Sequence, residues 1–170
     1  MNIYPDLYLE SIKFINSELL KKNKIKGLII DVDNTLIDYE KNLISGAEEW
    51  CEDLKSEGIK CMILSNTNKK EKVEKVATSL NIPYIMFAKK PFKGGFKKAK
   101  ELLGLKSSEI AVVGDQIFTD VIGARRMNMF SILVKQVDEK DILITRIKRP
   151  LEKIIIKKYL NEKGTKEDVF

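Results

Sequence analysis

The sequence of 170 residues contains no histidine. Histidine is the usual general base of Ser-His-Asp and Cys-His enzymes, and it is a common zinc ligand. Its absence excludes these classes, and phosphohistidine chemistry with them. Acid–base catalysis in this chain must therefore use Asp, Glu, Lys or Tyr.

Cysteine is almost as scarce, since only Cys51 and Cys61 occur. Their spacing supports neither a disulfide framework nor a thiolate zinc site, and we expect two reduced thiols. A cysteine phosphatase would need an arginine six positions after its cysteine, but Glu57 and Thr67 stand there. The glycine-rich motifs that hold nucleotide phosphates are also missing, which excludes the common nucleotide-binding loops.

Long apolar runs are absent too. No uninterrupted stretch approaches the roughly 20 residues of a membrane-spanning helix, and the N-terminus lacks the pattern of a secretory signal. We therefore expect a cytoplasmic protein. The 31 basic and 25 acidic residues give a net charge of +6, a mild bias toward phosphate-bearing or anionic partners. Dedicated nucleic-acid binders concentrate more positive charge, so nucleic acid is not an expected partner, and the oligomeric state stays open.

The length and the 44% hydrophobic content are typical of one globular domain, which we expect over residues 1–170. Apolar runs bounded by turn residues alternate with helical segments, and this pattern predicts an α/β fold with a central parallel sheet and helices on both faces. The expected strands are 27–31, 59–64, 83–87, 110–113 and 130–134. The expected helices are about 7–22, 47–58, 69–80, 95–103 and 121–127.

The last part of the chain, residues 141–170, is expected to form a basic helical tail. Residues 150–160 predict a helix with Pro150 in its first turn, and one face would carry Leu151, Ile154, Ile155 and Tyr159. Two interpretations remain open, because this helix can pack on the sheet or rest on an anionic surface. The basic residues concerned are Arg146, Lys148, Arg149, Lys153, Lys157 and Lys158.

Polar residues follow the apolar run 28–30, in the order Asp31-Val32-Asp33-Asn34-Thr35. The carboxyl ends of parallel strands are where such sheets bind ligands. Asp31 and Asp33 are close enough to repel each other unless a cation lies between them or one is protonated. Taken alone, the pentapeptide is as compatible with an ordinary turn or helix cap as with a functional site.

Polar residues also follow two other expected strands: Ser65 with Asn66 after 59–64, and Asp115 after 110–113, with Lys89 and Lys90 in a loop between them. Each has an ordinary interpretation, as a helix cap, a turn or a solvated pair of lysines. Because they all follow successive strands, we instead expect them to meet in one crevice that holds the acids, the hydroxyl and the ammonium group needed for phosphoryl transfer.

These residues resemble the motifs of the haloacid dehalogenase (HAD) superfamily, and more narrowly those of the YqeG branch of its subfamily IIIA phosphatases. A mitochondrial phosphatidylglycerophosphate phosphatase belongs to the same wider group. The similarity covers about residues 5–160. Motif one is Asp31–Leu36, motif two is Leu64–Asn66, motif three is Lys90–Pro91 and motif four is Gly114–Asp120.

The motifs predict distinct roles in hydrolysis of a phosphate monoester. Asp31 is the expected nucleophile, forming an aspartyl-phosphate, and Asp33 the expected general acid and base. Ser65, Asn66 and Lys90 are expected to bind the phosphoryl oxygens.

The acids would repel the incoming phosphate dianion, and we expect a bound Mg²⁺ to offset this repulsion. Its expected ligands are the side chains of Asp31 and Asp115 and, by family resemblance, the main-chain carbonyl of Asp33. Asp120 is expected to support the metal through water or to orient Lys90, although a first-turn acid facing the helix dipole explains it as well. Thr35 is expected to be structural.

Motif one is followed by only about ten residues before the next expected helix, so no large cap domain is expected. An open crevice suits a phosphate on a large or membrane-borne carrier, with phosphatidylglycerophosphate as the leading hypothesis and a location at the inner face of the membrane. The alternative is a catalytically silent HAD-fold module that recruits RNA or a partner protein. The intact Asp31 and Asp33 argue against it.

Overall fold

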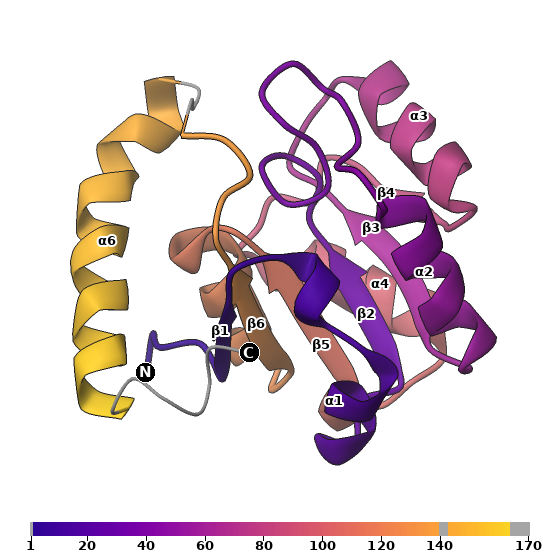
Figure 1. Ribbon diagram of the computed structural model, residues 1–170, viewed down its shortest axis with the longest axis horizontal. Coiled ribbons are helices and arrows are strands. Elements are labelled where there is room, and N and C mark those ends of the chain that lie inside the picture. Colours follow the sequence, from indigo (N-terminus) through magenta and orange to yellow (C-terminus); the bar gives the residue numbers. More distant parts are fainter. Residues whose placement is uncertain (1, 140–142, 164–170) are drawn as a thin grey trace.

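The computed structural model describes residues 2–139 and 143–163, without the side chains of 143–146. Six parallel strands form one sheet in the order β1-β6-β5-β2-β3-β4 (Figure 1). The strands are β1 (Leu7–Leu9), β2 (Gly27–Ile30), β3 (Lys60–Leu64), β4 (Tyr84–Ile85), β5 (Ile110–Gly114) and β6 (Phe130–Val134).

Helices cover both faces of the sheet, which confirms the predicted α/β class. The first face carries α1 (Ser17–Lys22), α2 (Ala47–Ser56) and α3 (Lys70–Leu80). The second carries α4 (Lys93–Leu103) and α5 (Ile122–Arg126). The long α6 (Leu143–Lys163) lies beside the β1 edge (Figure 1). Short turns of other helix types are η1 (Ile12–Phe14), η2 (Ser107–Glu109) and the π-helical η3 (Ile117–Val121).

The apolar run in β2 explains why this strand is central. Leu28 and Ile30 pack into the core under α1–α3, whereas Ile29 packs into the core under α4 and α5. A strand buried on both faces needs a continuous apolar sequence rather than an alternating one. β2 thus places the residue that follows it, Asp31, in the middle of the sheet edge.

The predicted helix over 7–22 is wrong. Residues 7–9 form the edge strand β1, which pairs with β6, and only α1 is an α-helix. Two polar side chains divide the segment: Ser11 accepts a hydrogen bond from the Lys13 N–H, and Asn16 from the Leu19 N–H. Such caps start new helices, and pairing with a strand more than 120 residues away in sequence is a tertiary effect that apolar spacing does not reveal.

The predicted start of the C-terminal helix is also wrong, because Pro150 lies inside α6 rather than in its first turn. The four apolar residues that were predicted to share one face of this helix do not share the same environment. Tyr159 is buried and Ile155 contacts the core, but Leu151 and Ile154 are exposed. The side chain of Arg146 lies outside the described residues. No helix in the described part of the chain is both long and apolar enough to cross a membrane.

The segment between β2 and α2 is a loop and not an inserted domain. Its regular pairing consists of two isolated bridges, Asp33 with Ile37 and Ile37 with Leu43. The predicted lack of a large cap at this position is confirmed for the described residues.

Candidate active site

Three neighbouring strands end at the same place. Asp31 follows β2, Ser65 follows β3 and Asp115 follows β5, and β2 lies between β3 and β5 in the sheet. A cleft of about 780 Å³ opens at this edge, with Asp31, Ser65 and Lys90 among its lining residues. Lysines outnumber acids in the lining, which contains Lys41, Lys69, Lys72, Lys90 and Lys148 beside Asp31, Asp33 and Asp38, together with the aromatic Tyr39 and Phe87.

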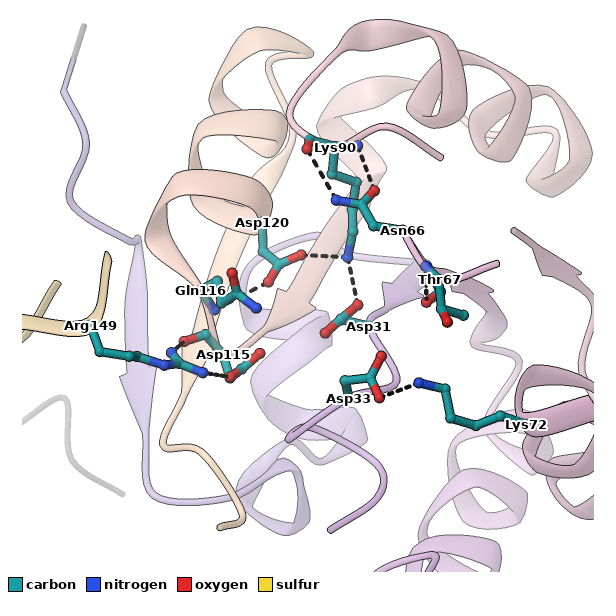
Figure 2. A network of polar contacts seen from close by, with 11 residues as sticks. Asp31, Asp33, Asn66, Thr67, Lys72, Lys90, Asp115, Gln116, Asp120 and Arg149 are labelled. Carbon is teal, nitrogen blue, oxygen red and sulfur yellow. Dashed lines mark hydrogen bonds and ion pairs between the residues drawn. The ribbon is translucent and has the colours of Figure 1, made fainter. Parts of the chain in front are cut away.

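Lys90 links two of the predicted acids. Its Nζ lies 2.6 Å from Asp31 Oδ1 and 2.7 Å from Asp120 Oδ1, and all three side chains are buried. Figure 2 shows the ammonium between the two carboxylates. Charged groups this deeply buried need such partners, because an unpaired charge would carry a large desolvation cost.

Asn66 fixes the main chain of Lys90. The Lys90 N–H donates to Asn66 Oδ1 at 2.6 Å, and Asn66 Nδ2 donates to the Lys90 carbonyl at 3.1 Å. Asn66 was predicted to bind phosphate, but its side-chain amide is hydrogen-bonded to the main chain of motif three. Lys89, in contrast, is exposed and is not part of the cleft lining.

Gly114 allows Asp120 to approach the strand end. A Cβ atom at position 114 would collide with the Asp120 carboxylate, so only glycine fits here. Asp120 lies in η3, and its Oδ2 accepts a hydrogen bond from the Gln116 N–H at 3.2 Å. Single π-helical turns are frequent at functional sites, and this one turns Asp120 back toward Lys90.

Burial makes these acids hard to ionise together. The pKa of Asp31 is raised to about 7, because the effects of burial and of the neighbouring Asp120 and Asp33 outweigh the lowering effect of Lys90. The pKa of Asp115 is raised well above its usual value, first by burial and then by Asp31 and Asp120, against the lowering effect of Arg149. Burial alone would lower the pKa of Lys90, but Asp120 and Asp31 raise it above its ordinary value.

Asp31, Asp115 and Asp120 can each direct one oxygen to a common point, because these atoms lie within 4.8 Å of one another. Asp115 Oδ1 is buried and has no hydrogen-bond partner among the described residues. An orphaned buried carboxylate oxygen beside two further acids suits a divalent cation, which prefers hard oxygen ligands. The residues present therefore fit a divalent metal.

Asp33 points away from this cluster, toward α3. Its Oδ1 lies 2.6 Å from Lys72 Nζ, with the side chains 41% and 11% exposed, respectively. Figure 2 shows this ion pair on the opposite side of Asp31 from Arg149. Lys72 was not among the residues predicted to form the site. Its place in the first turn of the helix after motif two was an available signal, because that turn lies at the ligand-binding edge.

The structure adds a second unpredicted cation, Arg149 of α6. Arg149 was expected only among the basic residues of the C-terminal tail. It instead pairs with the Asp115 carboxylate and donates from Nη1 to the Asp115 carbonyl at 2.9 Å. Glu152 accepts from Arg149 at 3.2 Å and from the Phe118 N–H at 3.2 Å. No local pattern marks this contact, because it joins elements that are 34 residues apart.

The remaining residues singled out in the sequence, Ser65, Thr35, Cys51 and Cys61, are all buried. The Ser65 hydroxyl is buried, lines the cleft and accepts from the Thr67 N–H at 3.2 Å. The Thr35 hydroxyl is buried and lacks a hydrogen-bond partner within the described part of the chain. Cys51 and Cys61 are buried free thiols, as predicted.

Comparison with known proteins supports an enzyme. The family model described as mitochondrial PGP phosphatase matches residues 1–137. The chain is 39% identical over 153 residues to "Probable phosphatase YqeG" of Bacillus subtilis (strain 168), covering 89% of this chain and 88% of that protein.

A more distant relative is a phosphatidylglycerophosphate phosphatase 1, chloroplastic/mitochondrial, of Arabidopsis thaliana. It is 25% identical over an alignment of 175 residues that covers 96% of this chain and 50% of that protein. A crystal structure from Corynebacterium glutamicum matches with a TM-score of 0.57 at 20% identity, covering 74% of this chain and 93% of that one. This last likeness concerns the fold alone.

The family match spans most of the chain and agrees with the sheet, the four motifs and the acidic cleft. The chain belongs to the mitochondrial PGP phosphatase family of the HAD superfamily and is a YqeG-like phosphatase.

Proposed function

We propose that this protein is a Mg²⁺-dependent phosphatase that hydrolyses a phosphate monoester through an aspartyl-phosphate on Asp31. The observation that carries the proposal is the position of Asp31. It is buried at the base of the cleft, with Lys90 on Oδ1 and the acids of motif four beside it.

The first step forms a bond between a carboxylate oxygen of Asp31 and phosphorus, while the bond from phosphorus to the leaving oxygen breaks. Asp33, which also lines the cleft, gives the leaving oxygen a proton. In the second step Asp33 removes a proton from water, whose oxygen attacks phosphorus and restores the Asp31 carboxylate. The products are the free alcohol and inorganic phosphate.

Asp31 and Asp115, with the main-chain carbonyl of Asp33, would hold Mg²⁺, and Asp120 would support it. When bound, the metal would offset the negative charge of the buried acids, keep Asp31 ionised and stabilise the charge on the transferred phosphoryl group. Lys90 and Ser65 line the cleft beside Asp31 and would contact the phosphoryl oxygens. Asn66 contributes by holding the Lys90 main chain.

The preferred substrate is phosphatidylglycerophosphate at an anionic membrane surface. The Arabidopsis relative supports this choice by its name. Three lysines of the cleft lining support it chemically, because the ammonium groups of Lys41, Lys69 and Lys148 could bind the second, diester phosphate of such a lipid. The basic tail and the missing cap suit a headgroup that is presented by a bilayer.

Magnesium-dependent release of phosphate from a generic aryl phosphate tests the activity. We expect turnover by the parent chain, loss of at least about 10³-fold in Asp31→Asn, and no change in Asp6→Asn. Asp6 is ion-paired with Arg125, outside the cleft lining. Activity that survives Asp31→Asn would contradict the assignment, and a folded but inactive parent would favour a silent binding module.

A further inference from the structure

The outer face of α6 carries an unusual set of exposed apolar side chains. Ile147, Leu151 and Ile154 are 77%, 57% and 65% exposed. Their spacing of four and three residues places them in one stripe along the helix. The opposite face holds the buried Glu152 and Tyr159, so the stripe points away from the domain core.

Lysines surround this stripe. The exposed residues of α6 include Lys148, Lys153, Lys157 and Lys158. Of the two acids between positions 147 and 163, Glu152 is buried beside Arg149. Glu162 lies near the far end of the helix, 3.9 Å from Lys158. At helical spacing Lys148 lies on one side of the stripe, Lys153 and Lys157 lie on the other, and Lys158 follows its last residue. An apolar stripe with lysines around it is the pattern of a helix that lies in a membrane interface.

The stripe leads to the cleft. Lys148 belongs to the cleft lining, and it directly follows Ile147 in the stripe. Arg149 ties the same turn of α6 to Asp115. In Figure 1 the N-terminal part of α6 lies toward the carboxyl ends of the strands. Two further exposed aromatic residues, Tyr39 and Phe87, line the same cleft as Lys148.

An anionic lipid bilayer fits this surface better than another protein does. A lone helix beside the sheet edge is convex, and a fluid interface can take up its aliphatic side chains without a matching groove. Lysine ammonium groups can reach phosphate headgroups while their stems lie along apolar surface. A second copy of the chain would instead bring like-charged lysines together at the contact.

We propose that the outer face of α6 is the docking surface for an anionic bilayer and that docking presents the cleft to lipid headgroups. The role of this docking in catalysis rests on the proposed lipid-phosphate substrate. Bilayer binding does not itself require catalysis, so an experiment can contradict the docking surface without contradicting the phosphatase activity, and the reverse.

Flotation of the full chain with phosphatidylcholine vesicles, with and without phosphatidylglycerol, tests the surface. We expect binding only to the anionic vesicles. The triple variant Ile147→Ser/Leu151→Ser/Ile154→Ser should bind about 100-fold more weakly. Lys153→Gln and Lys157→Gln should each cost about fivefold. The matched control Phe14→Ser/Leu102→Ser removes exposed apolar side chains from η1 and α4 and should bind like the parent.

Turnover of a soluble aryl phosphate should be the same in all these variants, which separates docking from the proposed catalysis and reports that each variant is folded. Parent chain that does not bind anionic vesicles, or a triple variant that binds them like the parent, would overturn the proposal. A shift from dimer to monomer in the triple variant without a loss of vesicle binding would identify a second copy as the occupant and would equally overturn it.

Discussion

Lys72 and Lys90 reach the same cleft and neutralise different acids. Lys90 serves the buried pair of Asp31 and Asp120, whereas Lys72 contacts the more exposed Asp33. Both lysines line the cleft, so each can contact an incoming phosphate dianion. Lys90 is thus the buried cation of the site, and Lys72 is the more exposed one.

Lys72→Met should lower kcat/KM for an aryl phosphate by about tenfold, because one charge-assisted contact is worth about 1.5 kcal/mol. Steady-state kinetics at saturating Mg²⁺ measures this. Lys75→Met is the matched control, since Lys75 is an exposed lysine of the same helix outside the cleft lining. Equal effects of the two substitutions would contradict a role for Lys72 in the cleft.

At the scale of elements, α6 completes the candidate active site from outside the motif-bearing part of the chain. Glu152 of this helix accepts a hydrogen bond from the Phe118 N–H, and Arg149 forms an ion pair with Asp115. Removal of Arg149 would leave two buried carboxylates without their cation, a change that is costly in protein interiors.

Arg149→Met should therefore lower the free energy of unfolding by about 3 kcal/mol in the absence of metal. Mg²⁺ should restore more stability to this variant than to the parent, because the cation then balances Asp115 without competition from the guanidinium. Urea unfolding with and without Mg²⁺ measures both effects.

Arg125→Met is the control for this prediction, because Arg125 pairs with Asp6 outside the cleft lining. It should be destabilised without an enhanced response to Mg²⁺. The same gain from Mg²⁺ in the parent and in both variants would argue against metal binding at Asp115.

Local sequence patterns predicted the elements that carry the motifs but not the edges of the fold. The apolar run before Asp31 and the strand over 130–134 needed only burial and turn signals. β1 was missed because pairing with β6 overrides a helical spacing of apolar residues. The motif residues could be placed at one sheet edge, whereas Lys72 and Arg149 depend on contacts between distant segments.

The prediction that Leu151, Ile154, Ile155 and Tyr159 share one face of α6 was wrong for a related reason. Aliphatic spacing suggested a single apolar face, but Leu151 and Ile154 are exposed whereas Tyr159 is buried. Glu152 is buried instead, since the Phe118 N–H and Arg149 satisfy its carboxylate. Which face of a helix is buried depends on such partners, and no local signal in this segment indicates them.

At the scale of the whole molecule, three buried acids at the carboxyl ends of the strands concentrate negative charge in a chain that is basic overall. Asp31, Asp115 and Asp120 are buried together, against Lys90 and Arg149. The excess charge is relieved by a proton or by a metal ion. Stability should therefore depend on pH and on metal together.

In the absence of metal, the folded protein keeps a proton on Asp31 up to about pH 7, whereas the unfolded chain releases it near its usual pKa of 3.8. The stability linked to this proton is fully present below the unfolded pKa and is lost as the pH rises through the folded pKa. The free energy of unfolding should fall by about 3 kcal/mol between about pH 5 and about pH 8.

Asp31→Asn should reduce this slope and leave only the part that the raised pKa of Asp115 contributes, whereas Asp6→Asn should keep the slope of the parent. Urea unfolding of the three proteins in a chelator, repeated across this pH range, measures the difference. A parent slope that is retained in Asp31→Asn would mean that another group carries the proton.

The central claim is that Asp31 forms a covalent bond to the phosphoryl group, and acid quenching of a single turnover with a radiolabelled phosphate monoester tests it most directly. We predict a hydroxylamine-labile label on the peptide that contains Asp31, present in the parent and in Asp6→Asn and absent from Asp31→Asn. A label on a different residue, or one that persists in Asp31→Asn, would contradict the account.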